Sequence, residues 1–225
     1  MVPMSKATSP APRKRVRLSP EIRKEQILDA ALVEFGAHGF SATSIDRIGA
    51  RAQLSKAGVY AHFASKDEIF ETLLMRSLTP SFAAQDWCPS PARPLEAIVD
   101  TYIDSSYDRF KEPRVAAVLR LLIAESGRMP QLVRRWRGEV LQPYLDQQQK
   151  MIDRCVAQGA VRPGPLTDFF DIVVAPVAQA WMMFLVFGDD FLRRDLKKLK
   201  EAHRKLLLDT LRLPEPAPAR RRKRA

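Results

Sequence analysis

The chain of 225 residues lacks the features of several large classes of protein. It holds two cysteines, and Cys88 and Cys155 have neither metal-ligand nor Cys-x-x-Cys spacing, so we expect two reduced thiols in a cytoplasmic protein. It contains no G-x-S-x-G elbow, no glycine-rich phosphate loop and no H-E-x-x-H motif, which argues against an enzyme. The three histidines, His38, His62 and His203, are not spaced as metal ligands, and we expect neither a metal nor a cofactor.

Long hydrophobic runs and strand patterns are also missing. The most apolar run, 172–187, is interrupted by Pro176 and Gln179 and bordered by acidic residues, so we expect a buried helix rather than a membrane span. The leading segment lacks the apolar run of a secretory signal, and no export is expected. Beyond Leu78 there is no alternating pattern or hairpin signal. With 46% apolar residues, the chain is expected to be all-α, with one small and one larger domain.

The net charge of +11 is concentrated at the two ends of the sequence. Residues 1–17 carry five basic residues and no acid, and residues 214–225 carry five basic residues and one acid, which together account for nine of the eleven charges. We expect a disordered basic arm over 1–18 and a disordered basic tail over 214–225. The arm is predicted to contact DNA, although both ends could serve only solubility. Its contact residues would be Arg13, Lys14, Arg15 and Arg17.

The segment over 42–63 has the pattern of two short helices joined by a tight turn. This arrangement presents a recognition helix to a DNA major groove. Thr43 with Asp46 forms a capping box that would start the first helix. The turn is Gln53-Leu54, and Ser55 can cap the second helix. Val59 and Phe63 would anchor that helix inward and leave a small, polar face outside.

Helices are predicted on both sides of this motif. Upstream, Ser19-Pro20-Glu21 gives a capped start, and Gly36-Ala37-His38-Gly39 gives a stop. Downstream, Ser65-Lys66-Asp67-Glu68 is a second capping box, so another helix begins two residues after Phe63.

From Ser19 to Leu78 the chain closely resembles the TetR/AcrR family of bacterial transcriptional regulators. The resemblance rests on Gly39-Phe40, Ser55-Lys56, Tyr60 and the segment Phe63-Ala64-Ser65-Lys66-Asp67. It implies a three-helix helix-turn-helix DNA-binding domain over 19–66, with the motif at 43–63, and a helical regulatory, effector-binding and dimerisation domain over 67–213. The chain departs from the family pattern in two places. Gln53 stands where glycine is usual, so a left-handed turn would cost about 1–2 kcal/mol, and Ala57-Gly58 replaces a Gly-Thr pair in the base-reading region.

The resemblance assigns the residues expected to contact DNA. Lys56, Tyr60 and Lys66 have suitable chemistry for bases or phosphates, although Tyr60 could be a core aromatic and Lys66 a solvated charge. Thr43 and Ser44 could bind phosphate or serve only as caps. The full predicted set is Thr43, Ser44, Ser55, Lys56, Ala57, Gly58, Tyr60, His62 and Lys66.

The remaining sequence predicts helices over 94–110, 114–126, 130–158, 165–187 and 191–213, separated by proline and glycine. Residues 117–132 are similar to the regulatory domain of one large branch of the family. The helix over 165–187 is apolar nearly all round, and the last helix carries a leucine stripe. Two such helices from each chain would form a four-helix dimer interface, as the resemblance also implies. The predicted interface residues are Trp181, Leu192, Leu196, Leu199 and Leu206.

The resemblance implies that large side chains in these helices line an effector cavity, with Glu125 and Gln148 as orienting polar groups, although the sequence alone favours ordinary core for any single one of them. The candidate set is Phe82, Trp87, Tyr102, Phe110, Glu125, Met129, Trp136, Tyr144, Gln148 and Met151.

The sequence as a whole predicts a homodimeric, ligand-responsive repressor, located in the cytoplasm at the nucleoid. It would bind a palindromic double-stranded operator and release it when a small, largely apolar effector binds. The alternatives are a DNA-architectural protein without an effector and a divergent helical enzyme.

Overall fold

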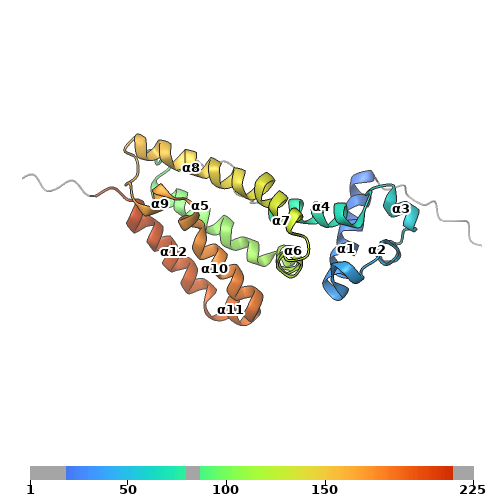
Figure 1. Cartoon of the computed structure of the whole chain (residues 1–225). Helices are drawn as coiled ribbons and strands as arrows, with labels where there is room; N and C mark the ends of the chain where they lie inside the picture. Colours follow the sequence, from blue (N-terminus) through green and yellow to red (C-terminus); the bar gives the residue numbers. More distant parts are fainter. Residues whose placement is uncertain (1–18, 80–86, 215–225) are drawn as a thin grey trace, which may run out of the picture.

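The computed structural model describes residues 19–79 and 87–214, and within these ranges the chain is helical with no strand (Figure 1). A small domain at one end holds α1 (Pro20–Ala42), α2 (Ile45–Arg51) and α3 (Lys56–Tyr60), and α4 (Lys66–Leu78) leads from it towards a larger body. The body contains α5 (Leu95–Asp108), α6 (Pro113–Glu125), α7 (Pro130–Trp136), α8 (Gln142–Ala157), α9 (Pro165–Asp168), α10 (Asp171–Phe187), α11 (Asp189–Arg194) and α12 (Leu196–Leu211). The predicted all-α, two-part fold is confirmed.

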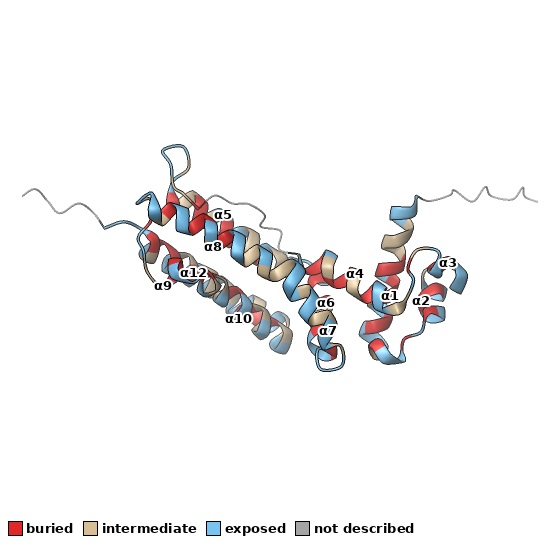
Figure 2. Ribbon diagram, turned by 45° about the horizontal axis from the view of Figure 1, so that its top comes forward, coloured by how far each residue is buried: buried red, intermediate tan, exposed pale blue. Residues whose placement is uncertain are grey.

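The small domain forms around the apolar face of α1. Ser19 caps this helix, its Oγ accepting a hydrogen bond from the backbone N–H of Ile22 at 3.4 Å, and Pro20 occupies the first helical position. Phe35 and its neighbours at helical spacing are buried against α2, α3 and α4 (Figure 2). The predicted stop over 36–39 falls at its last residue, because Gly39 has a φ of 76° that interrupts the helix, and one further turn then ends at Ala42.

The larger body has a second core between α5, α8, α10 and α12, which lie side by side in Figure 1. The predicted helices are confirmed with three local changes. A π-helical turn over Arg137–Leu141 joins α7 to α8, and a break at Phe169-Phe170 separates α9 from α10. Asp195 separates α11 from α12, where one helix over 191–213 was predicted. A π-helical turn inside a helix is often associated with a functional site.

The two parts meet at α4 and α6. Buried residues of α6, among them Val118 and Leu122, pack into the same cluster as Ile69 and Leu73 of α4 and the core of α1. The predicted boundary at residue 66 therefore does not separate two cores, since α4 shares the small domain's core.

Candidate DNA interface and effector cavity

The α2–α3 motif has the predicted shape, but its first cap differs by one residue. Ser44 caps α2, its Oγ accepting from the backbone N–H of Arg47 at 3.3 Å. Thr43 is only 2% exposed, and its hydroxyl donates to the carbonyl groups of Gly39 at 2.8 Å and Glu34 at 3.0 Å. The prediction that Thr43 caps α2 is wrong, and its buried hydroxyl is unsuited to a phosphate contact. Ser44 is exposed at the start of α2 and stays a candidate.

The turn between α2 and α3 is tight, and a glycine that sequence reasoning missed makes it possible. A Cβ atom on Gly49 would lie 2.9 Å from the carbonyl oxygen of Leu54 and 3.4 Å from Cγ2 of Val59, so only glycine allows this approach. Gln53 has a φ of 56°, the left-handed conformation expected of it. Leu54 N–H donates to the Gly49 carbonyl at 2.8 Å and closes the turn.

The outer face of helix α3 is exposed to solvent. Ser55 caps it as predicted, and Val59 is fully buried beneath it. Lys56 and Ala57 are exposed, and Tyr60 is 47% exposed, which excludes the alternative of a core aromatic. Gly58 and His62 are half-buried at the edges of this face.

Lys56 forms an exposed ion pair on this face. Its Nζ lies 3.0 Å from the Asp46 carboxylate, whose hydrogen bond and charge raise the pKa of Lys56. The pair is open to solvent, so the ammonium can exchange Asp46 for a phosphate with little structural cost.

Lys66 has a different role from the one predicted. Its ammonium donates to the carbonyl groups of Phe40 at 2.7 Å, Thr43 at 2.8 Å and Ser41 at 3.3 Å, and lies 4.4 Å from the centre of the Phe40 ring. All three donors of the ammonium are used within the protein. The predicted DNA contact is not supported by this geometry, and Lys66 instead satisfies the carbonyl groups at the end of α1.

An ionic network that the sequence analysis missed fixes α2 on α1. The buried Glu34 carboxylate accepts from Arg51 Nε at 2.5 Å and from Arg47 Nε at 3.1 Å, and lies 3.6 Å from His38. The hydrogen bond from Arg51, followed by that from Arg47, lowers the pKa of Glu34 although burial opposes it. In the sequence, an acidic residue at an inward-facing position of α1 could have indicated this network. The predicted arm residues Arg13 to Arg17 and the tail lie outside the described residues.

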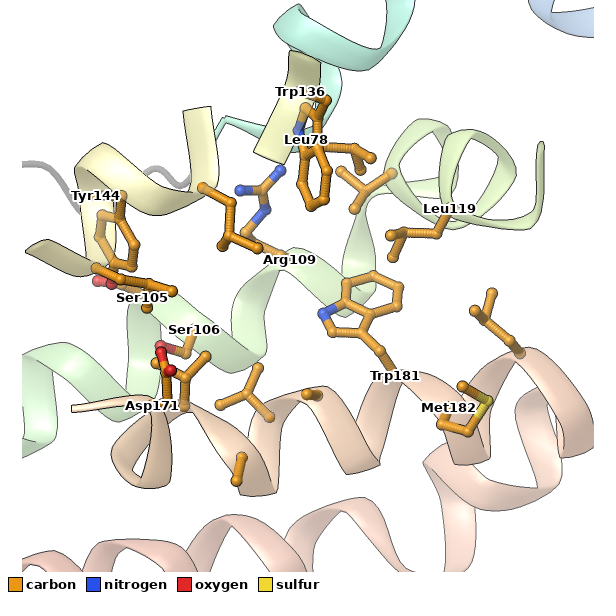
Figure 3. A pocket seen from close by; sticks show the side chains of 18 of the residues that line it. Leu78, Ser105, Ser106, Arg109, Leu119, Trp136, Tyr144, Asp171, Trp181 and Met182 are labelled. Carbon is orange, nitrogen blue, oxygen red and sulfur yellow. The ribbon is translucent and has the colours of Figure 1, made fainter. Parts of the chain in front are cut away.

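The larger body holds a cavity of about 460 Å³, within the range of about 300–1,000 Å³ typical of small-molecule sites (Figure 3). Its wall is mainly apolar and comes from α5, α6, α7, α8 and α10, from the π-helical turn, from a 3-10 turn over Arg109–Lys111, and from the last residue of α4. The lining residues are Leu78, Tyr102, Ser105, Ser106, Arg109, Val115, Leu119, Ile123, Trp136, Leu141, Tyr144, Leu145, Asp171, Val174, Ala175, Val177, Ala178, Trp181, Met182 and Leu185.

The structure brings three of the predicted cavity residues together, namely Tyr102, Trp136 and Tyr144. Others belong elsewhere: Phe110 stacks on Trp181 with ring centroids 4.0 Å apart, Met129 packs in the small-domain cluster, and Met151 lies in the core of the larger body. Phe82 lies outside the described residues. Sequence reasoning missed Arg109, Asp171 and the two serines of α5, because the apolar pattern does not show which helical faces surround a space.

The two predicted polar cavity residues do not reach the cavity. Glu125 is buried at the end of α6, where its Oε1 accepts from the backbone N–H of Phe40 at 3.2 Å. Gln148 is fully buried, and its Oε1 accepts from Trp87 Nε1 at 2.8 Å. The prediction for both residues is wrong, but Glu125 gives a direct hydrogen bond between α6, which lines the cavity, and the small domain.

The expectation of two reduced thiols is also wrong. Cys88 and Cys155 form a disulfide with an S–S distance of 2.10 Å, which joins the segment before α5 to α8 across 67 residues of sequence. The fold places them together although nothing in their spacing indicates it.

The predicted dimer residues do not form one exposed stripe. Leu192, Leu196 and Leu199 are half-buried against the core of their own subunit, and Trp181 lines the cavity. Leu206 is exposed, at 45%. On and beside α10 and α12, the exposed large apolar side chains are Phe169, Ile172, Met182, Val186, Phe187, Leu206 and Leu213.

Sites of two other kinds are absent from the described residues. No described helix is long and apolar enough to cross a membrane. Within 19–79 and 87–214, no group of three or more histidine, cysteine or acidic side chains is placed to hold a metal ion.

Comparison with known proteins gives matches to both parts of the chain. The family model described as bacterial regulatory proteins, tetR family, matches residues 27–73, and the model described as tetracyclin repressor-like, C-terminal domain, matches residues 94–199. The HTH-type transcriptional repressor SCO4008 of Streptomyces coelicolor is 39% identical over 59 residues, which are 26% of this chain. That match spans only 31% of the length of SCO4008.

Solved structures match over most of the chain. A TetR family transcriptional regulator from Pseudomonas syringae is 20% identical with a TM-score of 0.65, covering 86% of this chain and 98% of its own. SmeT in a complex with triclosan is 22% identical with a TM-score of 0.58, covering 88% of this chain and 99% of its own. At these identities the likeness concerns the fold.

Proposed function

Since this chain belongs to the TetR family of bacterial regulatory proteins, we propose that it is a homodimeric repressor that releases its operator when a small molecule fills the cavity. Binding DNA and regulating transcription are the functions of this family. Such a protein would act in the cytoplasm at the nucleoid. We retain 19–66 as the DNA-binding part and 67–213 as the regulatory part, with α4 connecting them.

The observation that carries the proposal is the exposed outer face of α3 within the matched segment. Lys56 and Tyr60 offer an ammonium and a phenol hydroxyl beside Ala57, which is small enough to let the helix approach base edges. Ser44 and Ser55 stand exposed at the starts of α2 and α3, where backbone N–H groups and the helix dipole favour phosphate.

The effector proposal rests on the cavity and its connection to the small domain. Residues of α6, including Leu119 and Ile123, line the cavity, and the same helix ends at Glu125, which holds the N–H of Phe40. A ligand that shifts α6 would therefore act on α1 through a hydrogen bond and a shared core. That SmeT was solved with triclosan supports a small-molecule effector for a protein of this fold.

The dimer proposal rests on the exposed apolar side chains of α10 and α12. A single subunit would leave Ile172 and Val186, the latter 66% exposed, together with Leu206 in water. We expect Leu206→Glu to favour the monomer in sedimentation, because a carboxylate would be buried unpaired between subunits. Lys205→Glu, at the exposed neighbouring position, is the control for added negative charge. A Leu206→Glu protein that stays as dimeric as this control would place the interface elsewhere.

The test of the function is selection of duplexes from a random pool, followed by titration of the selected sequence and of bulk DNA at one fixed salt concentration. A repressor should prefer its selected sequence by about a thousandfold or more. Tyr60→Phe should fold normally and bind all sequences more weakly, whereas Lys197→Ala, an exposed lysine on α12, should bind as wild type. Equal affinity for every duplex would instead indicate an architectural DNA-binding protein.

A further inference from the structure

Arg109 occupies the point at which the cavity meets α4. Its side chain lines the cavity, and its guanidinium donates to the carbonyl group of Thr79 at 2.7 Å and to that of Ser77. These carbonyl groups belong to the last turn of α4 and the residue after it, so they have no partner within the helix. The Arg109 side chain thus lines the cavity and also caps the C-terminal end of α4, the helix that leads to the DNA-binding domain.

The charge of Arg109 is not balanced by a bound carboxylate. No acidic side chain in the described ranges lies within ion-pair distance of its guanidinium, which is held by two neutral carbonyl groups. Burial lowers the pKa of Arg109, while the Glu112 carboxylate acts in the opposite direction. An arginine stays protonated under such conditions, so a positive charge lies at the border between this mainly apolar cavity and a more polar hollow lined by Ser77, Thr79 and Glu112.

Trp136 makes the same end of the cavity rich in donors. Its Nε1 is buried without a hydrogen-bond partner, and an indole N–H can only donate. In the view of Figure 3, the Trp136 indole and the Arg109 guanidinium both lie towards Leu78 of α4, whereas Asp171 lies at the opposite end with Ser105 and Ser106. The end nearest α4 therefore holds a charged donor group, which is bound to backbone carbonyl groups, and an indole N–H that has no partner.

We propose that the effector is an amphipathic anion, with an apolar body in the cavity and a carboxylate-like head that binds Arg109 and Trp136 in place of the α4 carbonyl groups. This inference rests on the proposed function and specifies the ligand class of its site. A carboxylate can accept two parallel N–H bonds from the guanidinium and also carries a negative charge. The two carbonyl groups are neutral, so their hydrogen bonds to the guanidinium are weaker. The apolar walls, including Val174 and Leu185, would enclose an alkyl or aryl chain.

The same competition supplies a route to DNA release. When the guanidinium turns to the ligand, the Ser77 and Thr79 carbonyl groups lose their donor. The ligand's negative charge also lies near the carbonyl end of α4, where the helix dipole disfavours an anion. Both effects loosen the last turn of α4, which carries the small domain at its other end.

Decanoate, decanol and decyltrimethylammonium test this inference, because they share one alkyl chain and differ in the charge of the head. Calorimetric titration of wild-type protein should give about ten- to hundredfold tighter binding of decanoate than of decanol, as expected for a charged hydrogen bond. Hydrogen exchange in the last turn of α4 should become faster with decanoate and stay unchanged with decanol at equal occupancy. Equal affinities for acid and alcohol, or tightest binding of the cation, would overturn the proposed ligand class.

Substitutions identify the residues that give the preference for decanoate over decanol. Arg109→Gln should remove the preference for decanoate over decanol, and Trp136→Phe should reduce it, whereas Arg120→Gln on α6 should keep it, because Arg120 lies outside the cavity lining. A preference that survives Arg109→Gln overturns the assignment. If instead a neutral or cationic probe fills the cavity and weakens operator binding, the ligand-responsive repressor stands and only the anionic class fails.

Discussion

Replacing Lys66 by methionine distinguishes a structural lysine from a DNA-binding one. Methionine keeps the aliphatic stem and removes the ammonium that donates to the Phe40 and Thr43 carbonyl groups at 2.7 and 2.8 Å and lies over the Phe40 ring. Hydrogen bonds to a charged group contribute about 1.5–3 kcal/mol net, and a cation over an aromatic face about 0.5–1 kcal/mol. After the cost of ordering the lysine side chain, we expect a loss of about 2–3 kcal/mol of unfolding free energy.

Two measurements on the same variant separate the roles. Urea unfolding should show the loss in the free energy of unfolding, while the slope of log affinity against log salt for the selected operator stays as in wild type. Lys56→Met is the matched variant: its ion pair with Asp46 is exposed, so stability should hardly change, and the slope should fall by about 0.9 for each phosphate that the protein no longer neutralises. A stable Lys66→Met protein with a reduced salt slope would refute our reading of Lys66.

Three further outcomes follow from individual contacts. Gly49→Ala should destabilise by about 1–3 kcal/mol in urea unfolding, because its Cβ would press on a backbone carbonyl, whereas Gly36→Ala, with no atom within 4 Å, should be neutral or stabilising. The pKa of Glu34 is lowered in the folded state, so its ionised carboxylate stabilises the fold above the ordinary glutamate pKa of 4.5, and this stabilisation is lost as the pH falls through the folded-state pKa. Urea unfolding at a series of pH values should therefore show a fall in the free energy of unfolding that the Glu34→Gln protein lacks. Reducing the Cys88–Cys155 bond, which closes 67 residues, should lower the unfolding free energy by up to about 4 kcal/mol, and a Cys155→Ser protein should not respond to reductant.

Local patterns in the sequence were sufficient for most of the fold. Caps at Ser19, Ser55 and Ser65 and breaks at proline and glycine are short-range signals, and the helices begin and end close to them. The cap of α2 was placed one residue early because Thr43 and Ser44 carry similar hydroxyl groups, and only the packing against α1 distinguishes them.

Features that depend on contacts distant in sequence could not be predicted in this way. The disulfide, the Glu125 bond to Phe40 and the position of Arg109 each join residues that only the tertiary fold brings together. The role of Lys66 could not be predicted for the same reason. Its three carbonyl partners lie 23 to 26 residues earlier in the sequence, and the residues next to Lys66 do not indicate them.

Hydroxyl-radical footprinting of the selected operator tests the central claim most directly, namely that a dimer presents two α3 helices to successive major grooves. The account predicts two symmetric protected regions centred about 34–36 Å apart along the DNA at saturation. Leu206→Glu protein should lose both regions together, because one half-site alone binds weakly. Protection of a single half-site at saturation, or uniform protection without two centres, would contradict it.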